Sequence, residues 1–242
     1  DIGTNLVGFI IKRAKFSGKS AHAGAAPHLG INALNAANLA MSAIAYIRET
    51  FPNEDYIRVS PVIKNANLAA SVIPEAVEIE MYVRAATVEA IEETTVKIDN
   101  CLNGAAIAIG CQVEINNLVG YLPLRQNELL SKITYQNAIQ ITEPSRVLNN
   151  CGIVAASGDI GDLSLLQLTI QIGYGGYKGT IHGVDFAIDR PEVIYLATAK
   201  LIISLICDLL DNDLQSFNQV VANFKGKSIS EYNQLITRLA NQ

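Results

Sequence analysis

The chain has 242 residues, of which 50% are hydrophobic and 17% charged, with 18 Lys and Arg against 23 Asp and Glu. This composition excludes a disordered or collagen-like chain and is typical of a globular protein with one large domain or two small ones. The net charge of −5 is mild and no basic cluster stands out, so a nucleic-acid or anionic-membrane partner has little electrostatic basis.

The chain begins with a strand, a helix and a second strand. Residues 6–17 are rich in β-branched and aromatic side chains and end at Gly18, which predicts a strand. Apolar residues at helical spacing predict a helix over residues 30–51. Residues 56–64 alternate as a strand does, and Pro61 assigns this strand to an edge of its sheet, because proline donates no hydrogen bond to a ladder.

The clearest alternation of apolar and polar residues covers residues 77–83, which predicts a strand that buries one face. Residues 87–108 carry an apolar stripe at helical spacing, and residues 112–119 alternate again. The order over residues 6–119 is therefore β-α-β-β-α-β, the ferredoxin-like arrangement of one sheet with two helices on one face. The other face of the sheet is left for solvent or a partner.

After Gly120 the pattern changes. Residues 125–142 predict a helix that stops before a proline. Residues 145–183 are rich in loop-forming residues, and within them the apolar run 168–172 predicts a buried strand.

The last third of the chain is helical. Residues 191–210 predict a strong helix with proline at its start. Lys200 and Asp208 interrupt its apolar run, so it falls short of the roughly 20 apolar residues of a membrane span. Residues 212–242 predict two amphipathic helices separated by Gly226.

The four cysteines show no C-x-x-C pair and no zinc-finger spacing. Scattered cysteines of this kind are typical of reduced, buried thiols, so we expect a cytoplasmic protein. The chain opens at Asp1, without Met and directly before strand-like sequence, which leads us to expect a mature or trimmed piece of a longer protein.

Two of the three histidines lie in loops of small residues. His22 lies in Gly18–Gly24, between a strand and a helix, and His182 lies in Gly179–Gly183. A single histidine is more often a surface or core residue than a ligand. Small residues, however, let a ligand approach closely, and functional side chains concentrate in loops. Both histidines are therefore candidate functional residues.

Two aspartates, Asp159 and Asp162, follow in the segment ASGDIGDLS. They form either an Asx-type turn or a loop shaped around an active site, and their spacing leaves both interpretations open.

Four stretches of the chain carry a family likeness: FSGKSAHAGAAPHLGINAL at 16–34, ASVIP through YVR at 70–84, GYLPL at 120–124, and the 157–164 loop followed by His182 and Phe186. Together they resemble the aminoacylase and glutamate-carboxypeptidase superfamily of zinc amidohydrolases, and most closely its aminobenzoyl-glutamate hydrolase branch. The likeness covers about residues 5–210 and leaves the tail unmatched.

The resemblance implies an α+β fold with three parts. Residues 5–119 would be the ferredoxin-like lid domain, which pairs with the lid of a second subunit into a homodimer. Residues 120–211 would be the C-terminal part of an α/β zinc-hydrolase catalytic domain, and residues 212–242 a helical tail.

The resemblance also implies roles for four residues. The histidine matching His22 reaches the partner subunit's active site, where an imidazole donor suits a tetrahedral oxyanion. The arginine matching Arg84 holds the substrate carboxylate, with Ser71 beside it in place of the family's usual asparagine. The histidine matching His182 is a zinc ligand.

From this likeness we expect hydrolysis of the amide bond in acyl-amino acids, aminobenzoyl-glutamate-like compounds or small peptides, with zinc or another divalent metal. The H-x-D segment and the paired glutamates precede the lid in the family and are absent from this sequence. A catalytic zinc needs about three protein ligands, so the chain alone is expected to be inactive and to bind zinc weakly. The alternatives are a non-catalytic dimerisation or binding module, one subunit of a split enzyme, and an amino-acid-binding regulatory domain, which leaves the His182 region unexplained.

Overall fold

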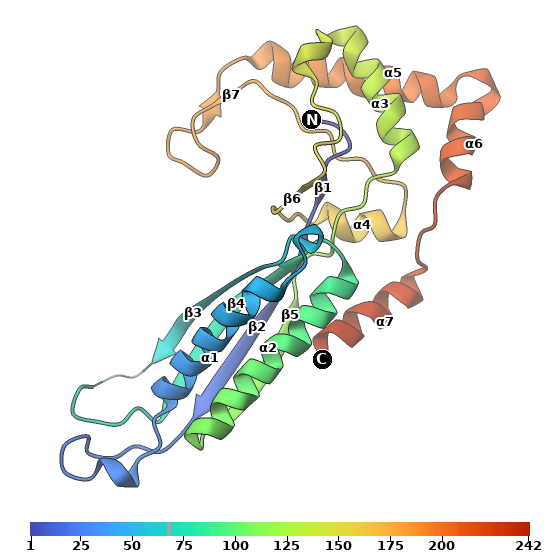
Figure 1. Ribbon diagram of the computed structural model, residues 1–242. Helices are drawn as coiled ribbons and strands as arrows, with labels where there is room; N and C mark the ends of the chain where they lie inside the picture. The colour runs from blue at the N-terminus through green and yellow to red at the C-terminus, as the bar shows by residue number, and fades with distance from the viewer. Residues whose placement is uncertain (67–68) are drawn as a thin grey trace. The chain divides into compact units, whose positions relative to one another are not determined.

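The computed structural model describes residues 1–66 and 69–242 (Figure 1). The backbone divides into two compact units. The sheet unit consists of Val7–Pro123, Ala155–Asp159 and Ile229–Gln242. The helical unit consists of Asp1–Leu6, Leu124–Val154 and Ile160–Ser228.

The sheet unit contains a four-stranded antiparallel sheet in the order β3-β4-β2-β5. Its strands are β2 (Gly8–Ser17), β3 (Arg58–Ala66), β4 (Ala76–Ala85) and β5 (Gln112–Val119). Helix α1 (Ala33–Ile47) connects β2 to β3, and helix α2 (Val88–Ile109) connects β4 to β5. The order of elements is thus β-α-β-β-α-β, and β3, which contains Pro61, lies at an edge.

Both helices lie on one face of the sheet (Figure 1) and are capped by side chains. Asn32 Oδ1 accepts from the main-chain N–H of Leu34 at 2.9 Å, and Thr87 Oγ1 accepts from Ala90 at 3.0 Å. Gly110, at φ +81°, ends α2 in the left-handed conformation that glycine adopts without a steric penalty. These caps satisfy main-chain groups that a helix end leaves unpaired.

The two faces of the sheet differ in chemistry. In β4, Ile79, Met81 and Val83 are buried on the helix side. The intervening residues Glu80 and Tyr82 point to the opposite face, since successive side chains of a strand alternate. No helix in the described part of the sheet unit covers that opposite face, which we call the open face (Figure 1).

A third helix, α7 (Ile229–Ala240), also belongs to the sheet unit and packs beside β5. It buries Leu235 and Leu239, and Arg238 pairs with Glu92 of α2 at 2.6 Å. The two predicted tail helices therefore fall in different units, with α6 (Gln215–Ala222) in the helical unit.

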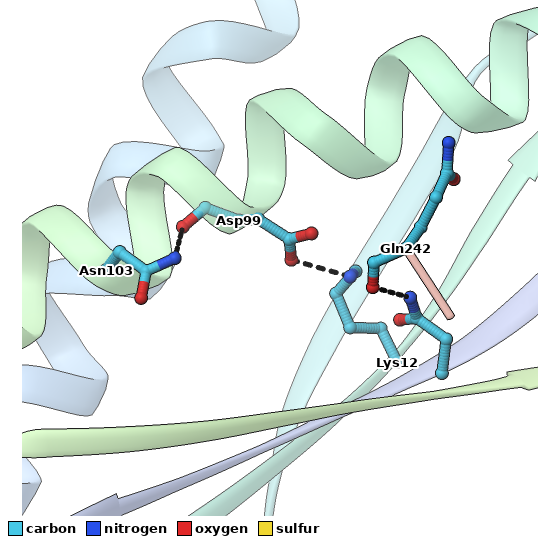
Figure 2. A network of polar contacts seen from close by, with 5 residues as sticks. Lys12, Asp99, Asn103 and Gln242 are labelled. Atoms are coloured by element: carbon cyan, nitrogen blue, oxygen red, sulfur yellow. Dashed lines mark hydrogen bonds and ion pairs between the residues drawn. The ribbon is translucent and has the colours of Figure 1, made fainter. Parts of the chain in front are cut away.

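A polar network ties the sheet to α2 and to the end of the chain (Figure 2). The Lys12 side chain is 0% exposed, and its Nζ lies 2.6 Å from Asp99 Oδ1. Burial lowers the pKa of Lys12 from its usual 10.5, while the Asp99 carboxylate opposes that shift. Asn103 Nδ2 donates to the main-chain carbonyl of Asp99 at 2.9 Å, and Asn117 Nδ2 donates to that of Gln242 at 2.9 Å.

The helical unit combines helices with short strand pairs, so the chain as a whole has the predicted α+β class. Its helices are α3 (Glu128–Ile141), α4 (Ile160–Leu166), α5 (Thr198–Leu210) and α6, with a π-helical segment at Glu192–Ala197. Its strands are β1 (Asn5–Leu6) parallel to β6 (Ile153–Val154), and β7 (Tyr177–Lys178) antiparallel to β8 (Ala187–Ile188). Short 3-10 turns occur at Pro27–Leu29, Arg48–Thr50, Asn53–Asp55, Pro144–Arg146 and Asn212–Leu214.

The predicted strand over residues 168–172 is wrong: the segment is irregular and pairs with no strand among the described residues. Its apolar side chains, including Leu168, Ile170 and Ile172, instead pack against the helical clusters around Leu130, Ala138 and Leu201. The apolar run at residues 168–172 therefore reflects packing against helices and not a place in a sheet.

The helix over Glu192–Leu210 is the one span among the described residues that is long and apolar enough to cross a membrane, with a mean hydropathy of 2.1. This differs from the prediction that the segment falls short. The helix buries Leu201 and Leu205 in its own unit, but only 17% of its apolar window is buried. A single such helix is weak evidence for a membrane, because the core helix of a globular domain passes the same test.

The four cysteines are free, but the expected burial is wrong for two of them. Cys151 and Cys207 are exposed, whereas Cys101 and Cys111 are half-buried.

Candidate functional site

His22 lies on an exposed loop between β2 and α1. Its Nδ1 accepts hydrogen bonds from the main-chain N–H groups of Gly24 at 3.2 Å and Ala25 at 3.0 Å. A ring nitrogen that accepts carries no proton, so in the neutral imidazole the proton lies on Nε2. The loop therefore fixes one tautomer and leaves Nε2–H as the donor.

The base of this loop is closed by two main-chain hydrogen bonds between Lys19 and Ile31, each 2.9 Å long. Gly18 stands at this closure, where a Cβ would lie 2.2 Å from the Ile31 carbonyl oxygen. Only glycine fits at this position without a clash, which explains why Gly18 begins the loop that carries His22.

The structure brings His22 and Ser71 together. The main-chain N–H of Ala23 donates to the carbonyl of Ser71 at 2.8 Å, and the N–H of Ile73 donates to the carbonyl of Ala21 at 2.9 Å. The two predicted residues thus lie on adjacent backbone segments at the end of the sheet where β2 finishes and β4 begins.

Arg84 lies at the other end of β4. In the β2–β4 register, Ser17 pairs with Ala76 at the first end and Gly8 with Ala85 at the second. Nine residue steps of extended chain span about 30 Å. Arg84 and Ser71, predicted to grip one carboxylate, are therefore far apart within a single chain.

Aromatic rings and a serine hold the Arg84 guanidinium in place. Its Cζ lies 5.2 Å from the centre of the Phe9 ring and 5.4 Å from that of Tyr82, and the two rings stack at 4.7 Å. Its Nη1 donates to Ser157 Oγ at 2.9 Å. The sequence singled out the 157–164 segment, but it carried no signal for this contact, which joins residues 73 positions apart.

His182 lies in the helical unit, on an exposed loop, with φ +65°. The N–H of Gly183 donates to the Thr180 carbonyl at 2.7 Å, and Asp185 Oδ1 accepts from Thr180 at 3.3 Å. The described residues contain no group of three His, Cys, Asp or Glu side chains that could hold a metal ion. His182 is therefore a single candidate ligand and does not fit a metal ion by itself.

A hollow of the helical unit, about 430 Å³, contains none of the predicted site residues. Its wall is mainly apolar and includes Ile2, Ile141, Val147, Val193, Leu196 and Leu201. The hollow borders the apolar helix over Glu192–Leu210, whose outer face is exposed.

Comparison with known proteins shows a domain match and two similar proteins. The peptidase dimerisation domain family matches residues 4–109. Over 206 residues the chain is 31% identical to the human Xaa-Arg dipeptidase and 29% identical to the mouse protein of that name. The match covers 81% of this chain but 46% and 47% of those proteins, so the chain spans about half their length.

Solved peptidases have the same fold. A tripeptidase from Staphylococcus aureus covers 85% of this chain at 21% identity with a TM-score of 0.66, and 53% of that protein is matched. The Bacillus subtilis protein YXEP, a dinuclear metal-binding peptidase of the M20 family, covers 87% of this chain at 16% identity with a TM-score of 0.66, and 52% of that protein is matched.

Proposed function

We propose that this chain, whose residues 4–109 match the peptidase dimerisation domain family, supplies the lid and part of the catalytic domain of a metal-dependent amidohydrolase of the M20 family. The proposed substrates are small peptides and acyl-amino acids, aminobenzoyl-glutamate-like compounds included. The relatives named Xaa-Arg dipeptidase support the peptide class.

The observation that carries this proposal is the separation of His22 from Arg84. His22 presents Nε2–H at one end of β4, and Arg84 lies about 30 Å away at the other. The two residues can act on one substrate only if they come from different subunits. A shared site thus requires the dimer, with His22 and Ser71 of one copy facing Arg84 of the other.

The proposed chemistry follows from the two side chains. When the amide carbonyl becomes tetrahedral, its oxygen gains negative charge, and a fixed Nε2–H donor stabilises that charge. The Arg84 guanidinium suits a substrate carboxylate, because its planar donors match two oxygens at once. Phe9, Tyr82 and Ser157 hold the guanidinium in position before the substrate arrives.

The dimer surface we propose is the side of the sheet unit formed by β3 and α1. An edge strand presents unpaired main-chain groups that a second copy can join. These two elements carry exposed large apolar residues: Leu39 and Tyr46 on α1, and Val62 and Ile63 on β3. Their burial against a second copy would remove the largest exposed apolar residues of α1 and β3 from water.

The remaining metal ligands would come from outside this chain. In this proposal His182 would supply one ligand, and the exposed face of α5 supports a helical unit that is part of a larger domain. The curated relatives are about twice as long as the matched region. We therefore propose that the chain alone is inactive, with zinc or another divalent ion bound only once the missing ligands are present. Four free cysteines support a reducing, cytoplasmic location as part of this proposal.

The test compares the 242-residue chain with a longer protein, which also includes any segment that the gene encodes before Asp1. Both are assayed on dipeptides and N-acyl amino acids with zinc present. We expect turnover only in the longer protein, and a loss of about 10²–10³ in kcat for His22→Ala. His28→Ala is the control, since His28 is exposed in the same loop.

A mixture of two inactive variants tests the shared site. Dimers that combine His22→Ala with Arg84→Gln contain one site with both residues intact and should regain part of the activity. Turnover or tight stoichiometric zinc in the short chain would refute the proposal, as would full activity of His22→Ala. If no upstream segment with H-x-D exists in the gene, a non-catalytic dimerisation module or one subunit of a split enzyme is the correct reading.

A further inference from the structure

Two arginines face each other directly on the open face of the sheet. In the β3–β4 register Arg58 is the cross-strand partner of Arg84. Directly opposed residues of an antiparallel pair have their Cβ atoms about 4.5–5.5 Å apart, and like charges at such positions repel. The arrangement is unfavourable unless something negative lies between the two guanidinium groups.

Neither guanidinium is paired with a carboxylate in the described part of the chain. Within residues 1–66 and 69–242, no carboxylate lies within ion-pair distance of Arg58 or Arg84. Arg58 Nη1 donates to its neighbour's carbonyl, that of Ile57, at 2.8 Å, and Arg84 Nη1 donates to a neutral hydroxyl.

Two other cations of the same face, Arg13 and Lys64, are paired with a carboxylate, unlike Arg58 and Arg84. Glu80 Oε2 accepts from both Arg13 and Lys64. These partners lower the pKa of Glu80, so the carboxylate stays ionised and its charge is balanced by two cations. The ion-pair partners of Glu80 are thus Arg13 and Lys64, and its negative charge does not balance the positive charges of Arg58 and Arg84.

The two arginines line a hollow of about 200 Å³. Ser60 and Tyr82 belong to the same wall and add hydroxyl groups beside the guanidinium donors. Glu80 also lines the hollow, with its carboxylate held by Arg13 and Lys64. Arginine forks bind carboxylate and phosphate oxygens in pairs, so this lining suits an anion with several oxygens.

We propose that Arg58 and Arg84 together form a binding site for a doubly charged anionic group. In the context of the proposed function, on which this reading of the substrate rests, Arg58 would be a specificity-determining residue. It would favour substrates with an acidic side chain next to the carboxylate held by Arg84. It would also disfavour a basic side chain at that position. The relatives named Xaa-Arg dipeptidase, by contrast, carry a name that refers to a basic residue.

The test is a calorimetric titration of the full chain at low ionic strength with succinate, inorganic phosphate and acetate. Acetate, with one charge, is the reference for the two dianions, succinate and phosphate. Comparison of succinate with phosphate distinguishes a dicarboxylate ligand from a phosphate ligand. We expect the dianions to bind at least about tenfold more tightly than acetate, because the second guanidinium adds a charge-assisted pair.

Arg58→Gln should weaken dianion binding at least about tenfold while leaving acetate binding within about twofold, and Arg58→Lys should fall between. Arg146→Gln is the matched control, because Arg146 is an exposed arginine of the helical unit that pairs with Glu143. Circular dichroism melting shows whether Arg58→Gln is folded, and the Arg58→Lys titration provides a second measure.

Three results would overturn the site: equal affinity for acetate and dianions, unchanged dianion binding in Arg58→Gln, or an equal loss in Arg146→Gln. Dianion binding by a full-length protein that hydrolyses no amide would refute the proposed function and leave this site standing. Hydrolysis that shows no preference for acidic over basic substrates, together with absent dianion binding, would refute this site alone.

Discussion

Lys12 and Asp99 form an ion pair of 2.6 Å between β2 and α2, with the lysine side chain 0% exposed and the aspartate 21% exposed (Figure 2). The two partners are therefore not equivalent. Loss of the aspartate leaves an enclosed charge without a partner, whereas loss of the lysine leaves a carboxylate that reaches water.

This asymmetry predicts different effects of removing each partner. Asp99→Ala should destabilise the protein by about 3–5 kcal/mol, the usual cost of an unpaired buried charge. Lys12→Met, which fills the same space with an apolar side chain, should cost clearly less. Urea unfolding of both variants, followed by circular dichroism, measures the difference. Equal losses would show that water reaches Lys12.

The same pair predicts a dependence on pH. Burial lowers the pKa of Lys12 in the folded state below its usual 10.5, and the loss of Asp99 removes the interaction that opposes this shift. Between the folded and unfolded pKa values the unfolded chain binds more protons, so stability should rise with pH in that window. Asp99→Ala should therefore regain more stability than the wild type as pH rises toward 10.5. Unfolding curves at a series of alkaline pH values test this, and a parallel decline of both proteins would contradict it.

Two glycines predict opposite effects of one substitution. Gly18→Ala places a Cβ 2.2 Å from the Ile31 carbonyl oxygen, which should cost about 1–3 kcal/mol and disturb the loop that presents His22. Gly104→Ala, within α2 and with nothing within 4 Å, should stabilise the protein by up to about 1 kcal/mol. Thermal melting of the two variants provides the comparison. A stable Gly18→Ala would mean that the loop relaxes without strain.

Helix α7 should contribute to the stability of the sheet unit. Leu239 is fully buried, so Leu239→Ala should cost about 2–5 kcal/mol. Ile229→Ala at the start of the same helix is the control, because Ile229 is 72% exposed. Hydrogen exchange of the β5 amides should increase in the Leu239 variant only. Unchanged exchange would mean that α7 is not part of the unit in solution.

The proposed dimer surface predicts a change of mass in solution. Tyr46 is 75% exposed on α1, and Tyr46→Glu places a charge in the proposed interface. Ile107→Glu on α2 is the matched control, since Ile107 is 80% exposed away from β3. Sedimentation equilibrium should show monomers for the first variant and dimers for the second. Dimers in both would place the interface elsewhere.

The sequence determined the local pattern of the sheet unit. Alternation and helical spacing predicted β2, α1, β3, β4, α2 and β5 in their order. Each of these elements buries one face, so its apolar residues recur with the period of a strand or a helix. Pro61 likewise indicated an edge strand, since proline lacks the N–H of an inner ladder. The likeness around His22 and Arg84 pointed to the peptidase dimerisation domain that residues 4–109 match, because a likeness of this kind depends on contiguous residues.

Only the tertiary structure decided which of these elements meet. Burial of Leu168–Ile172 on helices looks the same in sequence as burial in a sheet, so the predicted strand there was wrong. The place of Lys12 beneath α2, the contact of Arg84 with Ser157 and the opposition of Arg58 and Arg84 depend on packing and strand register. Periodicity shows which face of its own element a residue takes, but the partner on the other side is set by distant segments of the chain. For that reason the sequence named His22, Ser71 and Arg84, and the structure showed that Ser71 lies with His22 and far from Arg84.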